Sequence, residues 1–289
     1  MTDPARRPGP TLENRLPLEG INSSDEHPLR EFAWLLTAAL VTLALTVLLV
    51  GWAARWLAPR LPFAVEVALA ERIIDKPATA HSTARSAALQ ALAGRVAARM
   101  QLPQGISVLP TWESAPIINA YATVGGRIRV YQGLLDKLQS EEALAALLAH
   151  EIAHVKHRHV AANVGRGLAL AMLLGVVSAD AGAAAAETLL SSATGLALLS
   201  YSREQERQAD NEALAASVAL YGHGGGLVEL FTQLRPAAAA EDPSMALLRT
   251  HPMTQERIEA VQSRARNAGW SLAGDRTPLP ETLRRPAGP

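Results

Sequence analysis

The chain has 289 residues, of which 49% are hydrophobic and only 4% are aromatic, and it contains no cysteine. Its 27 basic and 27 acidic residues cancel, so no net charge indicates a nucleic-acid or acidic partner. Without cysteine there can be neither disulfides nor thiolate ligands, so any metal must be held by His, Asp or Glu.

The N-terminal part of the chain predicts a tail followed by a membrane anchor. Residues 1–31 are rich in proline and show no hydrophobic period, which is typical of a disordered tail. Residues 32–54 carry no charge, and as a helix they would extend about 34 Å, enough to cross a bilayer. Trp34, Trp52 and Trp56 would lie at the membrane surfaces. A cleaved signal peptide is the alternative, and it fits less well because the apolar run is long and the preceding tail partly acidic.

Arginines flank the predicted anchor in nearly equal numbers on its two sides, so they do not determine which side of the membrane the rest of the chain occupies.

Residues 60–270 predict one α+β domain that is mostly helical. Apolar residues recur at helical spacing over residues 64–101, which predicts helices there with an interruption at Gly94. Residues 106–109 are expected to form a short strand. Residues 117–131 predict a β-hairpin with its turn at Gly125-Gly126. Later helices are expected from Ser140 as N-cap and over residues 202–221, 226–235 and 252–268. Residues 222–226 predict a glycine loop, and residues 271–289 a flexible tail.

Residues 167–199 form a second apolar stretch, interrupted by Asp180 and Glu187. The favoured interpretation is a buried helical hairpin, because its acids would be costly in lipid. The alternative is a flap that dips into the membrane near the functional site.

The strongest chemical signal is the run His150-Glu151-Ile152-Ala153-His154 on an apolar helix. Two histidines four residues apart lie one turn apart on the same face, so both can reach one metal ion. Glu151 would lie beside the metal and could take a proton from an attacking water. The alternative is a surface helix with incidental His and Glu.

A catalytic zinc needs a third protein ligand, and Glu206 is the best candidate. It shares a helix face with Ala213 and Leu214, whereas Glu204 lies on the polar face. A buried glutamate needs a partner, which could be a metal or an arginine of its own helix. Asp210, one turn after Glu206, could accept a hydrogen bond from a ligand histidine.

The remaining histidines are weaker ligand candidates. A tetrahedral site cannot easily take its third ligand from the same straight helix, which makes His157 and His159 poor candidates. We therefore expect these two side chains to be solvated or to lie next to the ligands. The least supported are those in weakly patterned segments and in the glycine loop, namely His27, His81 and His223.

Several motifs together resemble the HtpX-like and CAAX-prenyl-protease-type family of gluzincin peptidases. The run from His150 to His159 is followed about 50 residues later by Ser202-Arg203-x-x-Glu206-x-x-Ala209-Asp210. Further sequence motifs also match the family pattern and occur in the same order. They lie around Asn119 and Gly125 and at His251-Pro252, with Arg257 beyond that pair. The resemblance covers residues 65–265, and Thr123-Val124 replaces the Leu-Pro often found before the glycine turn.

This resemblance implies a gluzincin fold and one zinc ion per subunit, bound by His150, His154 and Glu206. It implies Glu151 as general base, Asp210 as the partner of a ligand histidine, and His251 as the donor to the oxyanion. Substrate would add as a β-strand along Asn119, Ala120, Tyr121 and Ala122.

The predicted function is therefore a membrane-anchored zinc endopeptidase that acts on misfolded, membrane or envelope proteins. A single anchor indicates a single-pass protein of a bacterial inner membrane rather than a multi-span CAAX protease, and the envelope-acting relatives favour the periplasm. Protein or peptide substrates and the lipid membrane are its expected partners, and no oligomeric state is indicated.

Two other functions compete with this prediction, and activity could also be latent. The competing functions are a catalytically quiet, chaperone-like binding module and a hydrolase of non-peptide substrates. A latent state would arise if the 167–199 stretch or the loop at residues 223–226 covered the metal.

Overall fold

The computed structural model describes residues 28–57, 60–73, 83–190, 201–239, 247, 250–252 and 254–284. It divides into two compact units, one ending at Leu45 and one from Thr46 onward. As expected, the described part is mostly helical, with a three-stranded sheet and one N-terminal apolar helix.

Helix α1 spans Pro28–Leu57, so it begins before the predicted start of the anchor at Phe32. Pro28 suits the first turn of a helix, and Glu31 in that turn favours its positive end. The stretch Pro28–Ala53 is long and apolar enough to cross a membrane. The predicted tail over residues 1–27 lies outside the described residues.

The sheet has the order β1-β3-β2, so β2 is an edge strand. Its strands are β1 (Leu109–Glu113), β2 (Ala120–Thr123) and β3 (Arg127–Tyr131). Strands β2 and β3 form the predicted antiparallel hairpin through the 3-10 turn η2 (Val124–Gly126), in which Gly125 and Gly126 have φ of 74° and 72°. These left-handed angles are why glycine occupies the turn.

The strand predicted at residues 106–109 was misplaced. The Ile106 N–H donates to the Pro103 carbonyl in a turn, and β1 begins only at Leu109 and runs parallel to β3. The residues that form β1 are therefore determined by pairing with β3, which lies later in the chain.

Ten helices besides α1 and η2 are described, and the longer ones follow the sequence pattern closely, with Gly94 causing no break in its helix. They are α2 (Phe63–Ile73), α3 (Thr83–Arg99), α4 (Gln132–Leu135), α5 (Glu141–Lys156), α6 (His159–Val177), α7 (Ala179–Leu190), α9 (Arg203–Tyr221), α10 (Gly225–Ala239), α12 (Gln255–Ala268) and the 3-10 turn η3 (Glu281–Leu283). Leu247 and Thr250, between α10 and α12, are also helical.

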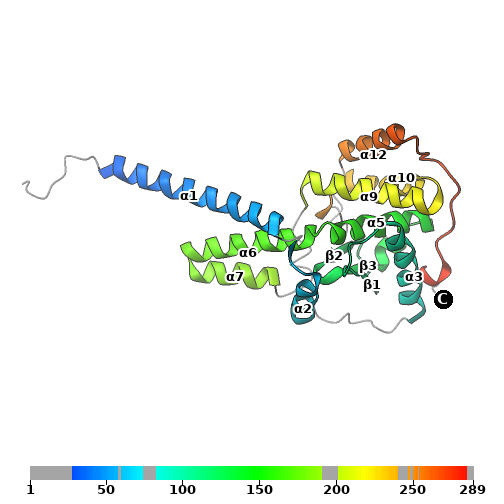
Figure 1. Cartoon of the computed structure of the whole chain (residues 1–289), viewed down its shortest axis with the longest axis horizontal. Coiled ribbons are helices and arrows are strands. Elements are labelled where there is room, and N and C mark those ends of the chain that lie inside the picture. Colours follow the sequence, from blue (N-terminus) through cyan, green and yellow to red (C-terminus); the bar gives the residue numbers. More distant parts are fainter. Residues whose placement is uncertain are drawn as a thin grey trace, which may run out of the picture. The chain divides into compact units, whose positions relative to one another are not determined.

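Helix α5 is the centre of the domain. Ser140 caps it as predicted, accepting a hydrogen bond from the Ala143 N–H, and α5 is buried from Glu142 to Val155. It contacts strand β2 and helices α9 and α10, and Figure 1 shows α5 and α9 side by side. Ser202 caps α9 through a capping box with Gln205.

Helices α6 and α7 form the expected helical hairpin, but the prediction that it is buried was wrong. Leu170, Met172 and Leu174 on α6 expose 50%, 70% and 40% of their surface. The hairpin buries its small residues against each other, with Gly175 packed on Gly182, and this leaves the leucines outside. Residues 191–199 of the predicted stretch lie outside the described residues.

The prediction of a flexible tail from residue 271 was also wrong for the described residues up to 284. The Thr277 N–H donates to the Glu142 carboxylate, and the side chains of Leu279 and Leu283 are buried. Burial of Leu279 and Leu283 therefore fixes this segment on the domain, although its sequence shows no hydrophobic periodicity.

Two helical glycines allow a matched stability test. Gly226, where the predicted glycine loop meets the predicted helix over residues 226–235, lies in the first turn of α10, and an added Cβ there would collide with the Glu142 backbone. Gly94 in α3 has no neighbour within 4 Å of such a Cβ. We expect Gly226→Ala to destabilise the domain by about 1–3 kcal/mol in urea unfolding, because the packing of α10 on α5 must shift.

Gly94→Ala is the control and should stabilise the domain by about 0.5–1 kcal/mol, because alanine has the higher helix propensity. Equal effects of the two substitutions would contradict the close contact between α10 and α5.

Candidate metal site

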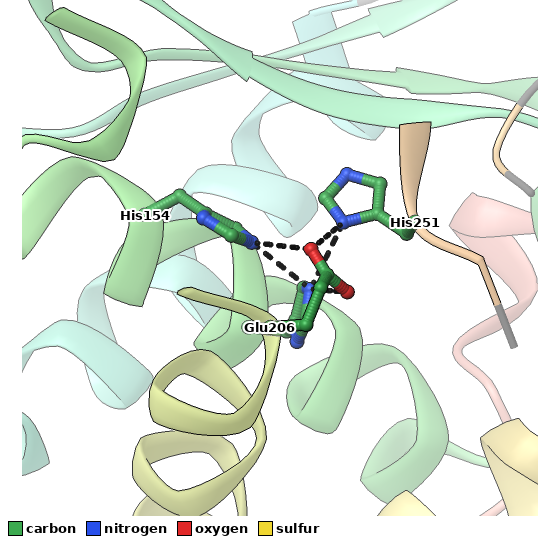
Figure 2. Close-up of side chains that lie close together, drawn as sticks. His154, Glu206 and His251 are labelled. Atoms are coloured by element: carbon green, nitrogen blue, oxygen red, sulfur yellow. Dashed lines mark hydrogen bonds and ion pairs between the residues drawn. The ribbon is translucent and has the colours of Figure 1, made fainter. Parts of the chain in front are cut away.

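Four buried side chains from three segments converge in the centre of the domain. His150 and His154 come from α5, Glu206 from α9, and His251 from the segment before α12. Figure 2 shows His154, Glu206 and His251 pointing toward one another. One ligand atom from each lies within 4.8 Å of the other three. His150 Nε2 and His154 Nε2 are 3.1 Å apart, and they lie 3.6 and 3.4 Å from the Glu206 oxygens.

This donor set fits a zinc ion, which prefers imidazole nitrogens and carboxylate oxygens when no thiolate is present. The buried polar atoms at the site that make no hydrogen bond include Glu151 Oε1 and His251 Nε2. Such orphaned atoms are costly unless a ligand, water or substrate engages them. His251 Nδ1 lies 2.9 Å from Glu206 Oε1 and 3.2 Å from His150 Nε2, so it stands at the position of a fourth ligand.

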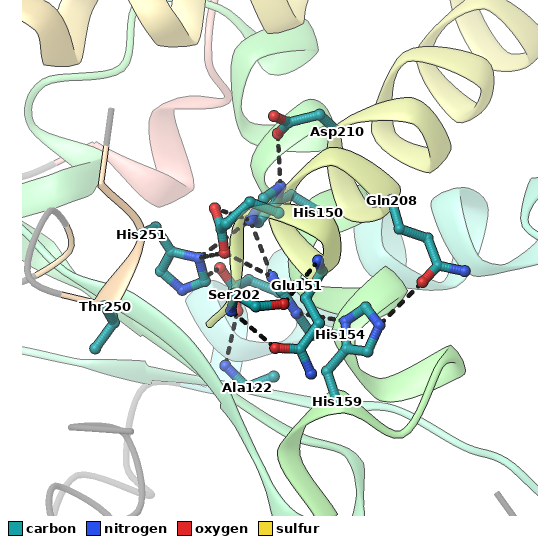
Figure 3. A network of polar contacts seen from close by, with 12 residues as sticks. Ala122, His150, Glu151, His154, His159, Ser202, Gln208, Asp210, Thr250 and His251 are labelled. Atoms are coloured by element: carbon teal, nitrogen blue, oxygen red, sulfur yellow. Dashed lines mark hydrogen bonds and ion pairs between the residues drawn. The ribbon is translucent and has the colours of Figure 1, made fainter. Parts of the chain in front are cut away.

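Glu151 is placed next to this cluster by strand β2. The Ala122 N–H donates to Glu151 Oε2 at 2.8 Å, and His251 Nε2 lies 3.7 Å from Glu151 Oε1 (Figure 3). Burial raises the pKa of Glu151 above its ordinary value, although His251 and His150 act in the opposite direction. A carboxylate with a raised pKa is a better proton acceptor.

A carboxylate and a guanidinium support the first ligand. Asp210 Oδ1 lies 3.1 Å from His150 Nδ1, as the sequence suggested for Asp210 (Figure 3). Arg257 of α12 donates to both Asp210 oxygens at 2.7 and 2.8 Å, and its Nη1 lies 2.6 Å from Glu206 Oε2. The arginine partner of Glu206 thus comes from another helix rather than its own.

The charges of this cluster determine its protonation. Burial opposes ionisation of Glu206, but the imidazoles of His251 and His150 hold its pKa well below the ordinary value. Burial is likewise outweighed at Asp210, where Arg257 lowers the pKa. Burial lowers the pKa of His154 well below 6.5, which keeps that imidazole neutral as a metal ligand requires.

The second ligand has different neighbours. The Tyr201 ring stacks on His154 with centroids 3.7 Å apart, and His159 Nδ1 lies 2.9 Å from His154 Nδ1. Burial lowers the pKa of His159 to about 4. His159 thus lies next to a ligand, as expected. His223 instead accepts a hydrogen bond from the Gly225 N–H, while His27 and His81 lie outside the described residues.

Sequence reasoning gave no role to Tyr201 or Arg257. Tyr201 precedes the helix cap Ser202, and Arg257 follows the His251-Pro252 pair, so each stands next to a recognised motif. Neither position carries a periodic signal that would have shown which way the side chain points.

The expected substrate strand lies at the site but is covered there. Strand β2 is the sheet edge nearest Glu151, and the Leu247 N–H donates to the Ile118 carbonyl at 3.3 Å, just before that strand. A cavity of only about 20 Å³ remains among residues that include Glu151, Leu247 and His251. In this structure the cover therefore comes from the segment that carries Leu247 and His251, which the sequence did not indicate.

A family model described as Peptidase family M48 matches residues 83–265. The chain is 30% identical over 174 residues to the mitochondrial metalloendopeptidase OMA1 of Schizosaccharomyces pombe, covering 58% of this chain and 50% of the relative. It is 29% identical over 150 residues to the metalloprotease YcaL of Escherichia coli, covering 51% and 58%. The beta-barrel assembly-enhancing protease of Escherichia coli is 27% identical over 158 residues, covering 51% and 32%. The matches thus span a third to three fifths of these relatives' lengths.

Arg257 should be essential for stability in the metal-free protein. Arg257→Met leaves Asp210 and Glu206 buried without their guanidinium, so we expect a loss of about 3–5 kcal/mol in urea unfolding. The control is Arg203→Met on α9, whose side chain is 88% exposed beside Glu256 and whose loss should cost less than about 1 kcal/mol. Similar losses for both variants would contradict the buried ion pairs.

Proposed function

The chain belongs to peptidase family M48, and we propose that it is a membrane-anchored, zinc-dependent endopeptidase. The zinc ligands would be His150, His154 and Glu206. The observation that carries the proposal is the buried convergence of these three side chains beside Glu151, which the edge strand β2 holds by one hydrogen bond. This arrangement would supply three ligands, a base and a docking edge within one small region.

The chain's own residues suit peptide hydrolysis. When bound, zinc polarises a carbonyl group and makes water a stronger acid. Glu151 would accept the proton of the attacking water at Oε1, the oxygen that makes no hydrogen bond, while the Ala122 N–H fixes Oε2. Glu151 then delivers that proton to the departing amine.

We assign to His251 the role of hydrogen-bond donor to the oxyanion. Its Nε2 is buried and makes no hydrogen bond, and despite its burial the charges of Glu206 and Glu151 raise the pKa of His251. A protonated imidazole there can donate a hydrogen bond to a developing negative charge. Because His251 Nδ1 also stands where a fourth ligand would, His251 must turn away from Glu206 for a substrate to enter.

The substrates that we propose are misfolded, membrane or envelope proteins. An extended segment would pair with the backbone of residues 119–122, and backbone pairing reads few side chains, which gives broad sequence specificity. The name of the beta-barrel assembly-enhancing relative supports an envelope role. We place the chain in a bacterial inner membrane with its peptidase domain in the periplasm.

Glu151→Gln should abolish proteolysis while sparing zinc binding. Losing the base is expected to lower the rate about 10²–10⁴-fold, because the amide cannot accept the proton. Cleavage of casein by the full chain in detergent measures the rate, and zinc content is measured on the same samples. Removing zinc with a chelator should abolish wild-type cleavage, and adding zinc should restore it.

The matched control is Glu204→Gln, an exposed position on α9 that should keep wild-type activity. A Glu151→Gln protein that cleaves casein within tenfold of wild type would contradict the assignment of the base. If that protein lost cleavage yet still rescued a client protein in cells, a quiet binding module would become the better function.

Helix α1 should hold the chain in the membrane. The full chain is expected to remain in the membrane pellet after alkaline carbonate extraction. Leu40→Arg combined with Leu43→Arg should release a large part of it, because each central arginine costs about 2.5–3.5 kcal/mol in the bilayer. Leu29→Arg, near the end of the span, is the control and should have little effect. Equal extraction of all three proteins would contradict a spanning α1.

A further inference from the structure

A continuous line of hydrogen bonds leads from the second ligand to the protein surface. His154 Nδ1 lies 2.9 Å from His159 Nδ1, and His159 Nε2 lies 3.1 Å from Gln208 Oε1 (Figure 3). Gln208 Nε2 lies 3.0 Å from His157 Nδ1, and His157 Nε2 lies 3.0 Å from Glu212 Oε1. We call His159, Gln208, His157 and Glu212 the relay.

The direction of every hydrogen bond in the relay follows from its inner end. His154 Nε2 faces Glu206 and His150, so it is the nitrogen that would bind the metal, and a metal-binding nitrogen must be unprotonated. His154 Nδ1 then carries the hydrogen and donates it to His159 Nδ1. His159 must in turn donate from Nε2 to the Gln208 carbonyl oxygen.

The outer end gives the same direction independently. The Glu212 carboxylate can only accept, so His157 donates from Nε2 and accepts at Nδ1. Gln208 must then donate from Nε2, which leaves its oxygen as the acceptor for His159. Both ends therefore require one consistent set of tautomers, with every donor pointing away from the metal.

The backbone is bent to build this arrangement. Helix α5 ends at Lys156, and Arg158 adopts the left-handed conformation with φ of 58°, which is unfavourable for a residue with a side chain. Arg158 is held there by Glu66 at 2.6 Å and by the Leu61 carbonyl at 3.1 Å. The bend turns the chain so that His159, at the start of α6, lies against His154.

We propose that His159 is the positioning residue for the metal ligand His154, and that the relay fixes its tautomer and ring orientation through to the anionic anchor Glu212. The Nδ1 of His150 has a carboxylate, that of Asp210, as its direct partner, whereas the Nδ1 of His154 is linked to the Glu212 carboxylate through His159, Gln208 and His157. Lys156 donates to both Glu212 oxygens at 2.9 Å and holds the outer end in place. The inference rests on the proposed role of His154 as a ligand.

Zinc affinity of the full chain in detergent, measured by competition with a chromophoric chelator, tests this proposal. His159→Phe keeps a ring but removes the acceptor, and we expect about 10–100-fold weaker zinc binding, as is typical when a ligand's partner is lost. His159→Asn should recover much of that loss, because its carbonyl oxygen can stand where Nδ1 stood. The visible absorption of the Co²⁺-substituted protein should shift in His159→Phe more than in His159→Asn.

Glu212→Gln tests the outer end of the relay, with Glu204→Gln as the same change on the exposed face of the same helix. We expect weaker zinc binding for Glu212→Gln and an unchanged affinity for Glu204→Gln. If His159→Phe shows no cooperative thermal transition and so does not fold, the comparison of Glu212→Gln with Glu204→Gln tests the proposal instead. Equal zinc affinities of these two variants would overturn the relay.

Two other results would also overturn it. One is zinc binding by His159→Phe within twofold of wild type, and the other is an equal loss for His159→Phe and His159→Asn. Failure of the proposed function looks different, because the wild-type chain would then neither bind zinc tightly nor lose cleavage on Glu151→Gln.

Discussion

Burial of charge between α5 and α9 is the constraint on which the rest of the domain depends. Glu206 and Asp210 lie one turn apart on α9, and both are almost completely buried. An uncompensated ionised group in such a place costs several kcal/mol, so each must face a cation or a donor. Arg257 of α12 faces both carboxylates, and the imidazoles of α5 face them from the other side. Three helices are thereby fixed relative to one another by one polar cluster.

Small side chains are what allow this cluster to form. Helices approach more closely when the residues between them are small. Both helices carry alanines next to their polar residues, and four of these alanines are buried to 1% exposure or less: Ala149, Ala153, Ala209 and Ala213. Glutamate and histidine side chains then reach across the gap between α5 and α9.

The parts of this fold that could be predicted from sequence are those with a local cause. Helical spacing placed His150 and His154 on one face, Ser140 and the Gly125-Gly126 turn marked an element start and a hairpin, and the apolar face of α9 indicated Glu206. What could not be predicted depends on partners distant in sequence. Strand β1 is selected by β3, and the segment after residue 271 is held by single leucines. For the same reason Arg257 and Tyr201 gave no signal, because their direction is set only when α12 and α9 meet α5.

Charge balance explains why a divalent ion suits this centre better than a monovalent ion or none. The dry cluster contains three carboxyl groups, those of Glu151, Glu206 and Asp210, and one guanidinium, that of Arg257. Because burial keeps His154 neutral, the ionised cluster carries an excess of two negative charges unless a cation joins it. A divalent ion supplies that charge and lets Glu151 remain an ionised base. The raised pKa of His251 fits the same picture, since a protonated His251 offsets part of the same excess.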